Sequence, residues 1–303
     1  MAITSKKKGL SLLQRRTIIG YLFIAPFILG FIFWFLIPAL VAANLTFQKW
    51  NLISPARYIG FDNIQKLFTD PILPKSLKAT FIYAFFSVPI GLVFAFFLAT
   101  LINAKVRGIA LFRTIYFLPS IVPAVASALL WAWIFNTEFG LLNVVVRFFG
   151  GSKIAWLQDP NLALVAFVIM STWGVGNSMV IFLAGLQGIP ESYYEAADLD
   201  GAGRWHKLWN ITLPLMSPII FFNLVIGFIS SFQIFVLPLM ITNGGPQNAT
   251  LTLVLYIYRT AFQSQNMGYA ATLSWLLFFF LMIFSFIIFR VVGKRVYYEN
   301  AGD

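Results

Sequence analysis

Residues 191–214 read Glu191-Ser-Tyr-Tyr-Glu-Ala-Ala-Asp-Leu-Asp-Gly-Ala-Gly-Arg-Trp-His-Lys-Leu-Trp-Asn-Ile-Thr-Leu-Pro214, and this polar loop is the densest charged segment of the chain. Hydrophobic runs without a charge flank the loop on both sides. Pro190 suits the first turn of a helix, and the acidic residues that follow it favour the helix dipole. The pattern predicts a short helix in water between two membrane spans.

One face of the expected helix carries the residues at positions i, i+3, i+4 and i+7, which are Tyr193, Ala196, Ala197 and Asp200. The two alanines leave this face thin, so the backbone of another protein can come close. Gly201 and Gly203 can end the helix and turn the chain. An amphipathic piece, residues 204–212, then leads back into the membrane. On this chemistry alone, a docking element and a solvated loop are equal alternatives.

The polar loop resembles the EAA motif found in the membrane subunits of bacterial and archaeal ABC importers. The matching positions are Glu195, Ala196, Ala197, Gly201, Ile211, Leu213 and Pro214. The resemblance implies a coupling helix, which sits in a groove on a separate ATPase subunit and passes that subunit's closing motion to the membrane helices.

Composition sets the class of the protein. Hydrophobic residues make up 60% of the 303 residues and charged residues 10%, against roughly 25% charged in soluble domains. The net charge of +11 comes from basic residues at the ends of hydrophobic runs, which is typical of membrane proteins and not of nucleic-acid binding. The chain has no cysteine, so it offers neither disulfides nor a thiolate metal site.

Six hydrophobic runs reach the roughly 20 residues that a bilayer span needs. They cover residues 18–45, 79–104, 114–135, 162–186, 215–241 and 268–289. We therefore expect an all-α membrane protein with six transmembrane helices. The expected divisions are a basic cytoplasmic tail 1–16, a first span 17–45, an extracellular cap loop 46–78, a transmembrane core 79–290 that includes the EAA loop 188–214, and a cytoplasmic tail 291–303.

Basic residues set the expected orientation. Thirteen of the 21 lysines and arginines fall in segments that this topology places inside, and eight fall outside. Cytoplasmic segments carry the excess of such residues. Both termini and the polar loop are therefore expected in the cytoplasm, where an ATPase is found.

Further segments are similar to the carbohydrate-uptake family of ABC permeases, the maltose and glycerol-phosphate type. They read Arg113-Thr-x-Tyr-Phe-Leu-Pro119, Trp131-x-Trp-Ile-Phe-Asn136, Phe182-Leu-Ala-Gly-Leu-Gln187, Thr242-Asn-Gly-Gly-Pro246 and Tyr256-x-Tyr-Arg-Thr-Ala-Phe262. The resemblance implies the type I importer permease fold, with a five-helix core and an N-terminal helix that packs on a partner permease.

Missing chemistry excludes several functions. None of the six expected spans contains an acidic or basic residue or a histidine, whereas ion-coupled pumps commonly carry such groups in the membrane. The chain has no phosphate-binding G-x-x-x-x-G-K-[ST] loop, and His206, the single histidine, is expected to be a solvated loop residue. We expect no catalytic residue, no metal site and no cofactor on this chain, with ATP and magnesium bound by the partner ATPase subunits.

The pathway is expected to consist of neutral polar groups and aromatic rings, which suit the hydroxyls and apolar faces of sugars. Similarity to the maltose-type permease puts contact positions on or near Ser120, Ser171, Gly174, Ser178, Ser230 and Ser231, with Trp173 as an aligned marker. Small polar residues also mediate helix packing, and for Ser171 and Ser230 the two interpretations are equal. Asn177 and Gln233 favour the pathway, because a buried amide is costly without a partner.

These observations predict a permease subunit of an ATP-driven sugar or oligosaccharide importer in a bacterial or archaeal plasma membrane. Its expected partners are a second, non-identical permease, two ABC ATPase subunits, an extracellular solute-binding protein and membrane lipid, with no nucleic acid. An ion-coupled secondary carrier or passive channel is the alternative. The sugar, the subunit that holds it and the identity of the second permease stay open.

Overall fold

The computed structural model describes residues 11–104, 108–293 and 296–297. The expected basic tail up to residue 10, the basic residues at 105, 107, 294 and 295, and the tail from residue 298 lie outside the described residues.

Helices make up most of the described chain. They are α1 (Leu12–Phe31), α2 (Ile37–Leu45), α3 (Asp62–Thr69), α4 (Leu73–Ile102), α5 (Ile109–Phe117), α6 (Ala124–Ile134), α7 (Leu141–Phe148), α8 (Ala163–Trp173), α9 (Gly176–Gln187), α10 (Glu191–Leu199), α11 (Arg204–Lys207), α12 (Leu213–Phe232), α13 (Leu253–Tyr258) and α14 (Met267–Val291). A two-stranded antiparallel hairpin, β1 (Gln48–Lys49) and β2 (Arg57–Tyr58), follows α2.

Four helical stretches of the described chain are long and apolar enough to cross a membrane, namely 12–45, 73–102, 204–232 and 267–291. Two bent pairs, α5 with α6 and α8 with α9, bring the number to six if each pair is one span. The prediction of an all-α membrane protein is confirmed, and the expected six spans are reached if each bent pair is one span. Both bends carry residues that favour a break, since prolines remove helical N–H donors and Gly174 follows the last residue of α8.

The ends of several helices differ from the expected spans. The first helix starts at Leu12, and α4 starts at Leu73, inside the expected cap loop 46–78. The helix of the fifth expected span starts at Arg204 and ends at Phe232, whereas the expected span covers residues 215–241. The helix ends differ from the expected spans because hydropathy marks the depth of a segment in lipid, whereas caps and turns decide where a helix ends.

The side chain of Asp70 fixes the start of α4. Its carboxylate accepts the backbone N–H of Ile72 at 2.8 Å and the hydroxyls of Tyr256 and Tyr269. Burial raises the pKa of Asp70, but these hydrogen bonds and one from the Leu73 N–H outweigh it and leave the pKa below its ordinary value. The group ties the end of α3 to α4, α13 and α14.

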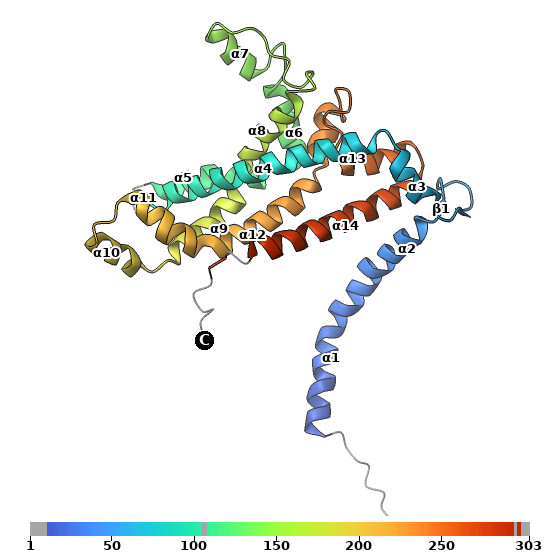
Figure 1. Ribbon diagram of the computed structural model, residues 1–303, viewed down its shortest axis with the longest axis horizontal. Coiled ribbons are helices and arrows are strands. Elements are labelled where there is room, and N and C mark those ends of the chain that lie inside the picture. The colour runs from blue at the N-terminus through green and yellow to red at the C-terminus, as the bar shows by residue number, and fades with distance from the viewer. Residues whose placement is uncertain (1–10, 105–107, 294–295, 298–303) are drawn as a thin grey trace, which may run out of the picture.

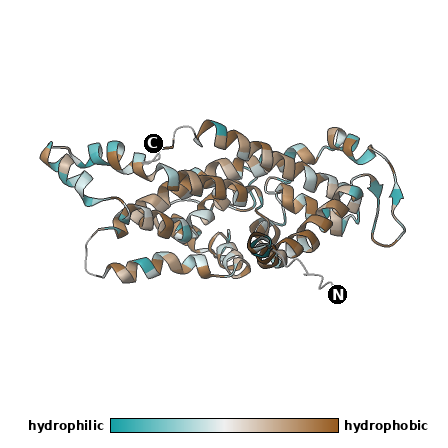
Figure 2. Ribbon diagram, turned by 90° about the horizontal axis from the view of Figure 1, so that it is seen from below, coloured by the Kyte–Doolittle hydropathy of each residue, from teal (hydrophilic) through white to brown (hydrophobic). Residues whose placement is uncertain are grey.

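The bundle is built around α4, which packs against α8, α9 and α12 (Figure 1). Phenylalanine rings fill the space between α4, α12 and α14. Phe232 is 1% exposed and meets Phe81 and Phe280 edge-on, with ring centroids 5.4 and 5.1 Å apart. Hydrophilic residues gather at the two ends of the bundle, and the middle is hydrophobic (Figure 2).

The N-terminal arm, residues 12–45, leaves the bundle (Figure 1). None of its residues is buried within the chain, and only its last part, α2, packs against α14. Trp34 is 86% exposed. A helix that is apolar on all sides needs lipid or another protein as its neighbour.

Two π-helical segments, residues 32–36 and 208–212, each end two residues before a proline, Pro38 or Pro214. Proline has no N–H for the carbonyl four residues earlier. At these places the helical turn is wider by one residue. In the second segment, for example, the Leu213 N–H donates to the Leu208 carbonyl, five residues earlier. The expected separate piece 204–212 is therefore the start of one continuous helix that ends at Phe232.

Candidate coupling site and transport pathway

The helix α10 lies at one end of the molecule, away from the core (Figure 1). Its C-terminus is closed by Gly201, which has a φ of +75°. The Ala202 N–H donates to the Ala197 carbonyl at 2.8 Å, and the Gly201 N–H donates to the Asp198 carbonyl at 3.0 Å. This pair of bonds is a complete Schellman motif, which needs a left-handed residue at the glycine position.

A cavity of about 520 Å³ opens between α10 and the helix that follows it. The residues that line it include Tyr193, Ala196, Ala197, Asp200, Gly201, His206 and Ile211. The structure thus brings the expected helix face together with Ile211, which belongs to the far end of the motif. His206 is exposed to solvent, as expected.

The other motif residues lie around this cavity. Glu195 is exposed on α10, while Leu213 and Pro214 are half-buried in the first turn of α12. The motif therefore has an exposed part on α10 and a part inside the helix that enters the membrane.

Two side-chain links join α10 to that helix. The Tyr194 hydroxyl is hydrogen-bonded to the Thr212 hydroxyl at 3.0 Å, and the Lys207 ammonium forms an ion pair with the Asp198 carboxylate. Thr212 is buried and also donates to the Lys207 carbonyl at 3.3 Å. The sequence prediction missed these residues, since nothing in the sequence tells how α10 is oriented against α11.

The breaks in the third and fourth spans meet. The helix axis bends by 99° between α5 and α6 and by 48° between α8 and α9. The Ser120 hydroxyl donates to the Gly174 carbonyl at 3.5 Å. A Cβ on Gly176 would lie 2.4 Å from the Ser120 Oγ and 2.9 Å from the Phe117 Cα, so this contact requires a glycine. Gly176 is a positioning residue that the sequence prediction did not single out.

The break after α12 adjoins the same region. Ile234, just beyond the helix end, packs with Trp131 of α6 against a buried cluster that contains Phe167 and Met170 of α8. Trp173 meets Trp131 edge-on with centroids 5.8 Å apart. Three interrupted helices therefore surround one aromatic cluster, and the expected pathway residues lie at or beside the interruptions.

The exposure of these residues separates them into two groups. Gly174, Asn177, Ser230 and Gln233 are exposed on the surface of the chain, whereas Ser120, Ser171, Trp173, Ser178 and Ser231 are half-buried. The amides of Asn177 and Gln233 are therefore not buried within this chain, since α9 and the end of α12 turn these side chains outward. Ser171 bonds within its own helix to the Val168 carbonyl at 2.7 Å. Ser231 is 3.4 Å from the Ser87 hydroxyl of α4, a packing contact.

The family model described as binding-protein-dependent transport system inner membrane component matches residues 87–298, which is more than half of the chain. The chain belongs to this family. The probable ABC transporter permease protein YesP of Bacillus subtilis is 40% identical, over 97% of this chain and 96% of that protein. The lactose transport system permease protein LacF of Rhizobium radiobacter is 34% identical, over 97% of this chain and 100% of that protein.

A solved structure of a bacterial alginate ABC transporter, in complex with an alginate pentasaccharide-bound periplasmic protein, matches with a TM-score of 0.81. The match is 22% identical and covers 92% of this chain and 96% of that chain. The fold is therefore that of a type I ABC importer permease, as predicted. As a member of the inner membrane component family, the chain is a multi-pass transport subunit of a binding-protein-dependent system, and this favours an importer over the ion-coupled carrier or passive channel.

Proposed function

We propose that this chain is one of two permease subunits of an ATP-driven importer for a sugar or oligosaccharide, and that α10 is its coupling helix. Two separate ABC ATPase subunits bind ATP and magnesium. A solute-binding protein delivers the sugar at the outer face. The N- and C-termini and α10 then lie in the cytoplasm.

The surface of α10 and its links to α12 carry this proposal. The thin alanine face, the cavity beside it and the exposed Glu195 offer a docking surface at the end of the bundle. The Tyr194–Thr212 hydrogen bond and the Asp198–Lys207 ion pair join that surface to a helix that continues to Phe232. A solvated loop needs neither of these links.

The mechanism that follows is alternating access. ATP binding closes the two ATPase subunits and displaces α10. The links carry the displacement into the helix 204–232, which ends beside the helix breaks around Trp131 and Met170. The interruptions supply neutral polar groups and free backbone carbonyls where the sugar passes, and backbone of this kind is tolerated in a membrane where it lines a cavity.

The exposed pathway residues also support a second permease. Asn177 and Gln233 stand on the surface of the chain, and an amide facing lipid is costly. A partner subunit across this surface encloses both side chains in a shared, hydrated pathway. The unburied N-terminal arm is the part of the chain that packs on the partner.

A sugar is the proposed cargo. The name of the 34% identical relative LacF specifies lactose transport, and the six hydrophobic runs offer hydroxyls, amides and aromatic rings without an acidic residue, a basic residue or a histidine. Hydroxyls and rings match the two kinds of surface that a saccharide presents.

The deciding experiment is the ATPase activity of the purified complex in lipid, with and without the binding protein and a panel of saccharides. We expect one saccharide to stimulate hydrolysis, and Glu195→Ala to abolish the stimulation while the complex still inserts. If no ATPase co-purifies and the chain alone passes solute through a bilayer, the proposal is wrong.

A further inference from the structure

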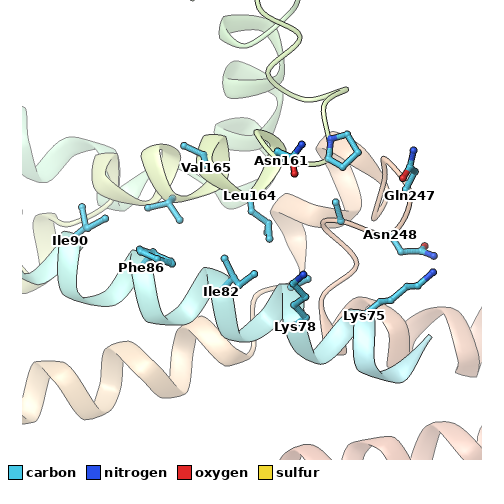
Figure 3. Close-up of a pocket in the computed structure, with 14 residues that line it drawn as sticks. Lys75, Lys78, Ile82, Phe86, Ile90, Asn161, Leu164, Val165, Gln247 and Asn248 are labelled. Atoms are coloured by element: carbon cyan, nitrogen blue, oxygen red, sulfur yellow. The ribbon is translucent and has the colours of Figure 1, made fainter. Parts of the chain in front are cut away.

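A groove of about 520 Å³ lies between α4, the start of α8 and the loop 247–249 (Figure 3). It is at the end of the bundle where α4 begins, opposite the end that carries α10 (Figure 1). None of the residues given a role in coupling or transport above lines this groove.

The mouth of the groove is cationic. Lys75 and Lys78 are exposed and lie one helical turn apart on α4; Lys75 extends towards Asn248, and Lys78 extends into the groove (Figure 3). The fourteen lining residues include no acidic residue. Within the described part of the chain, neither ammonium group forms an ion pair. Two positive charges without an acidic neighbour in the lining favour an anion at this mouth.

The floor of the groove is apolar and long. Beyond the lysines, Ile82, Phe86 and Ile90 follow on α4 at intervals of four residues, and Leu164 of α8 extends towards them (Figure 3). The twelve steps along the helix from Lys78 to Ile90 span about 18 Å at 1.5 Å per residue. That length is close to the roughly 15 Å depth of one leaflet, which is half of a hydrocarbon core of about 30 Å.

We propose that this groove binds one anionic phospholipid. Its phosphate lies between Lys75 and Lys78, the amide groups at the mouth bind the remaining headgroup oxygens, and one acyl chain lies along the floor. Basic pockets between transmembrane helices recognise anionic lipid headgroups in this way. A saccharide does not suit the site, because its hydroxyls find no partners on a floor of aliphatic side chains and one phenyl ring.

This inference needs only the membrane-spanning fold and not the proposed coupling. If α10 is cytoplasmic, as proposed, the groove and its lipid lie in the outer leaflet, and this is the one point that rests on the proposed function. The partner permease's N-terminal arm is the competing occupant of the groove, and the second experiment below distinguishes it from a lipid.

The first test counts phosphatidylglycerol bound to the full chain, purified with its membrane partners, by native mass spectrometry. We expect the wild-type chain to retain one phosphatidylglycerol that Lys75→Gln/Lys78→Gln binds about twenty-five-fold more weakly, from a roughly fivefold contribution of each lysine. The matched control is Lys49→Gln/Arg57→Gln, which removes two exposed charges from the β1–β2 hairpin at the same end of the molecule and leaves retention unchanged. Equal retention by the groove variant, equal loss by the control, or equal binding of phosphatidylcholine would overturn the proposal.

The second test uses the absence of cysteine from the chain. Phe86 is 58% exposed, so the chain is expected to tolerate Phe86→Cys, which places a single thiol on the floor of the groove. A benzophenone attached to it is expected to cross-link to phosphatidylglycerol, with a gain of one lipid mass, and glycerol phosphate in excess is not expected to compete. A cross-link to a second permease chain, or full competition by glycerol phosphate, would contradict an acyl chain in the groove.

Discussion

Gly201→Ala tests whether the turn at the end of α10 is what positions the coupling surface. No heavy atom lies within 4 Å of the position that a Cβ on Gly201 would take, so the substitution creates no clash. Its cost is confined to the backbone, because the residue has a φ of +75°. A left-handed conformation costs an L-residue about 1–2 kcal/mol, and a stiffer unfolded chain returns about 0.4–1 kcal/mol.

The net cost is about 1 kcal/mol, which lowers the ratio of the native turn to its open forms about fivefold. We expect sugar uptake by the reconstituted complex to fall by a similar factor, while insertion into the membrane is unchanged. Gly201→Asn is expected to retain more uptake, since asparagine tolerates the left-handed region better than alanine. Gly201→Asp, which also adds a charge to the docking surface, is expected to uncouple hydrolysis from transport.

Gly203→Ala is the matched control. Gly203 has a φ of −70° and equally open surroundings, so the same added methyl group meets neither strain nor a clash. The reasoning fails if Gly201→Ala supports wild-type uptake, or if Gly203→Ala reduces uptake to the same extent.

Three further predictions follow from contacts elsewhere in the chain. Tyr194→Phe removes the hydroxyl that is hydrogen-bonded to Thr212, an interaction worth about 1 kcal/mol. We expect this variant to move less sugar per ATP hydrolysed. An unchanged ratio of sugar to ATP would exclude a role of this hydrogen bond in coupling. Gly176→Ala forces a Cβ against backbone atoms and is expected to cost about 1–3 kcal/mol, seen as a lower Tm in detergent, whereas Gly174→Ala meets nothing within 4 Å and should leave the Tm unchanged. Asp70 has a pKa below its ordinary value, so its ionised form stabilises the fold above about pH 4, and this stabilisation is lost as the pH falls through the lowered pKa. Asp70→Asn should therefore lower the Tm at neutral pH and flatten its decline in acid, and an equal effect of Asp62→Asn, which changes an exposed carboxylate, would contradict this role.

The number of spans and the start of α10 were predictable because their signals are local. A run of twenty apolar residues has few alternatives to a membrane helix, and a proline before two glutamates is typical of a helix start. The glycine at 201 likewise predicted the turn that closes α10. Each of these patterns depends on residues that are close in sequence.

The arrangement of the candidate site was not predictable, because it depends on contacts between distant residues. Gly176 matters through its approach to Ser120, 56 positions away. The helices α9 and α12 are apolar on most sides, so periodicity does not show which face turns inward. For this reason the sequence indicated the depth of Asn177 and Gln233 but not their direction.

The π-helical segment 208–212, which lies just before Pro214, can act as a pivot that enlarges a displacement. From Thr212 to Phe232 the helix is about 30 Å long, and from Thr212 back to Arg204 it is about 12 Å long, at 1.5 Å per residue. If the helix pivots at the π segment, a displacement of about 1 Å at Arg204 becomes about 2.5 Å at Phe232, in proportion to these two arms. In the proposed coupling, a displacement of α10 is thus enlarged by the time it reaches the inner end of this helix.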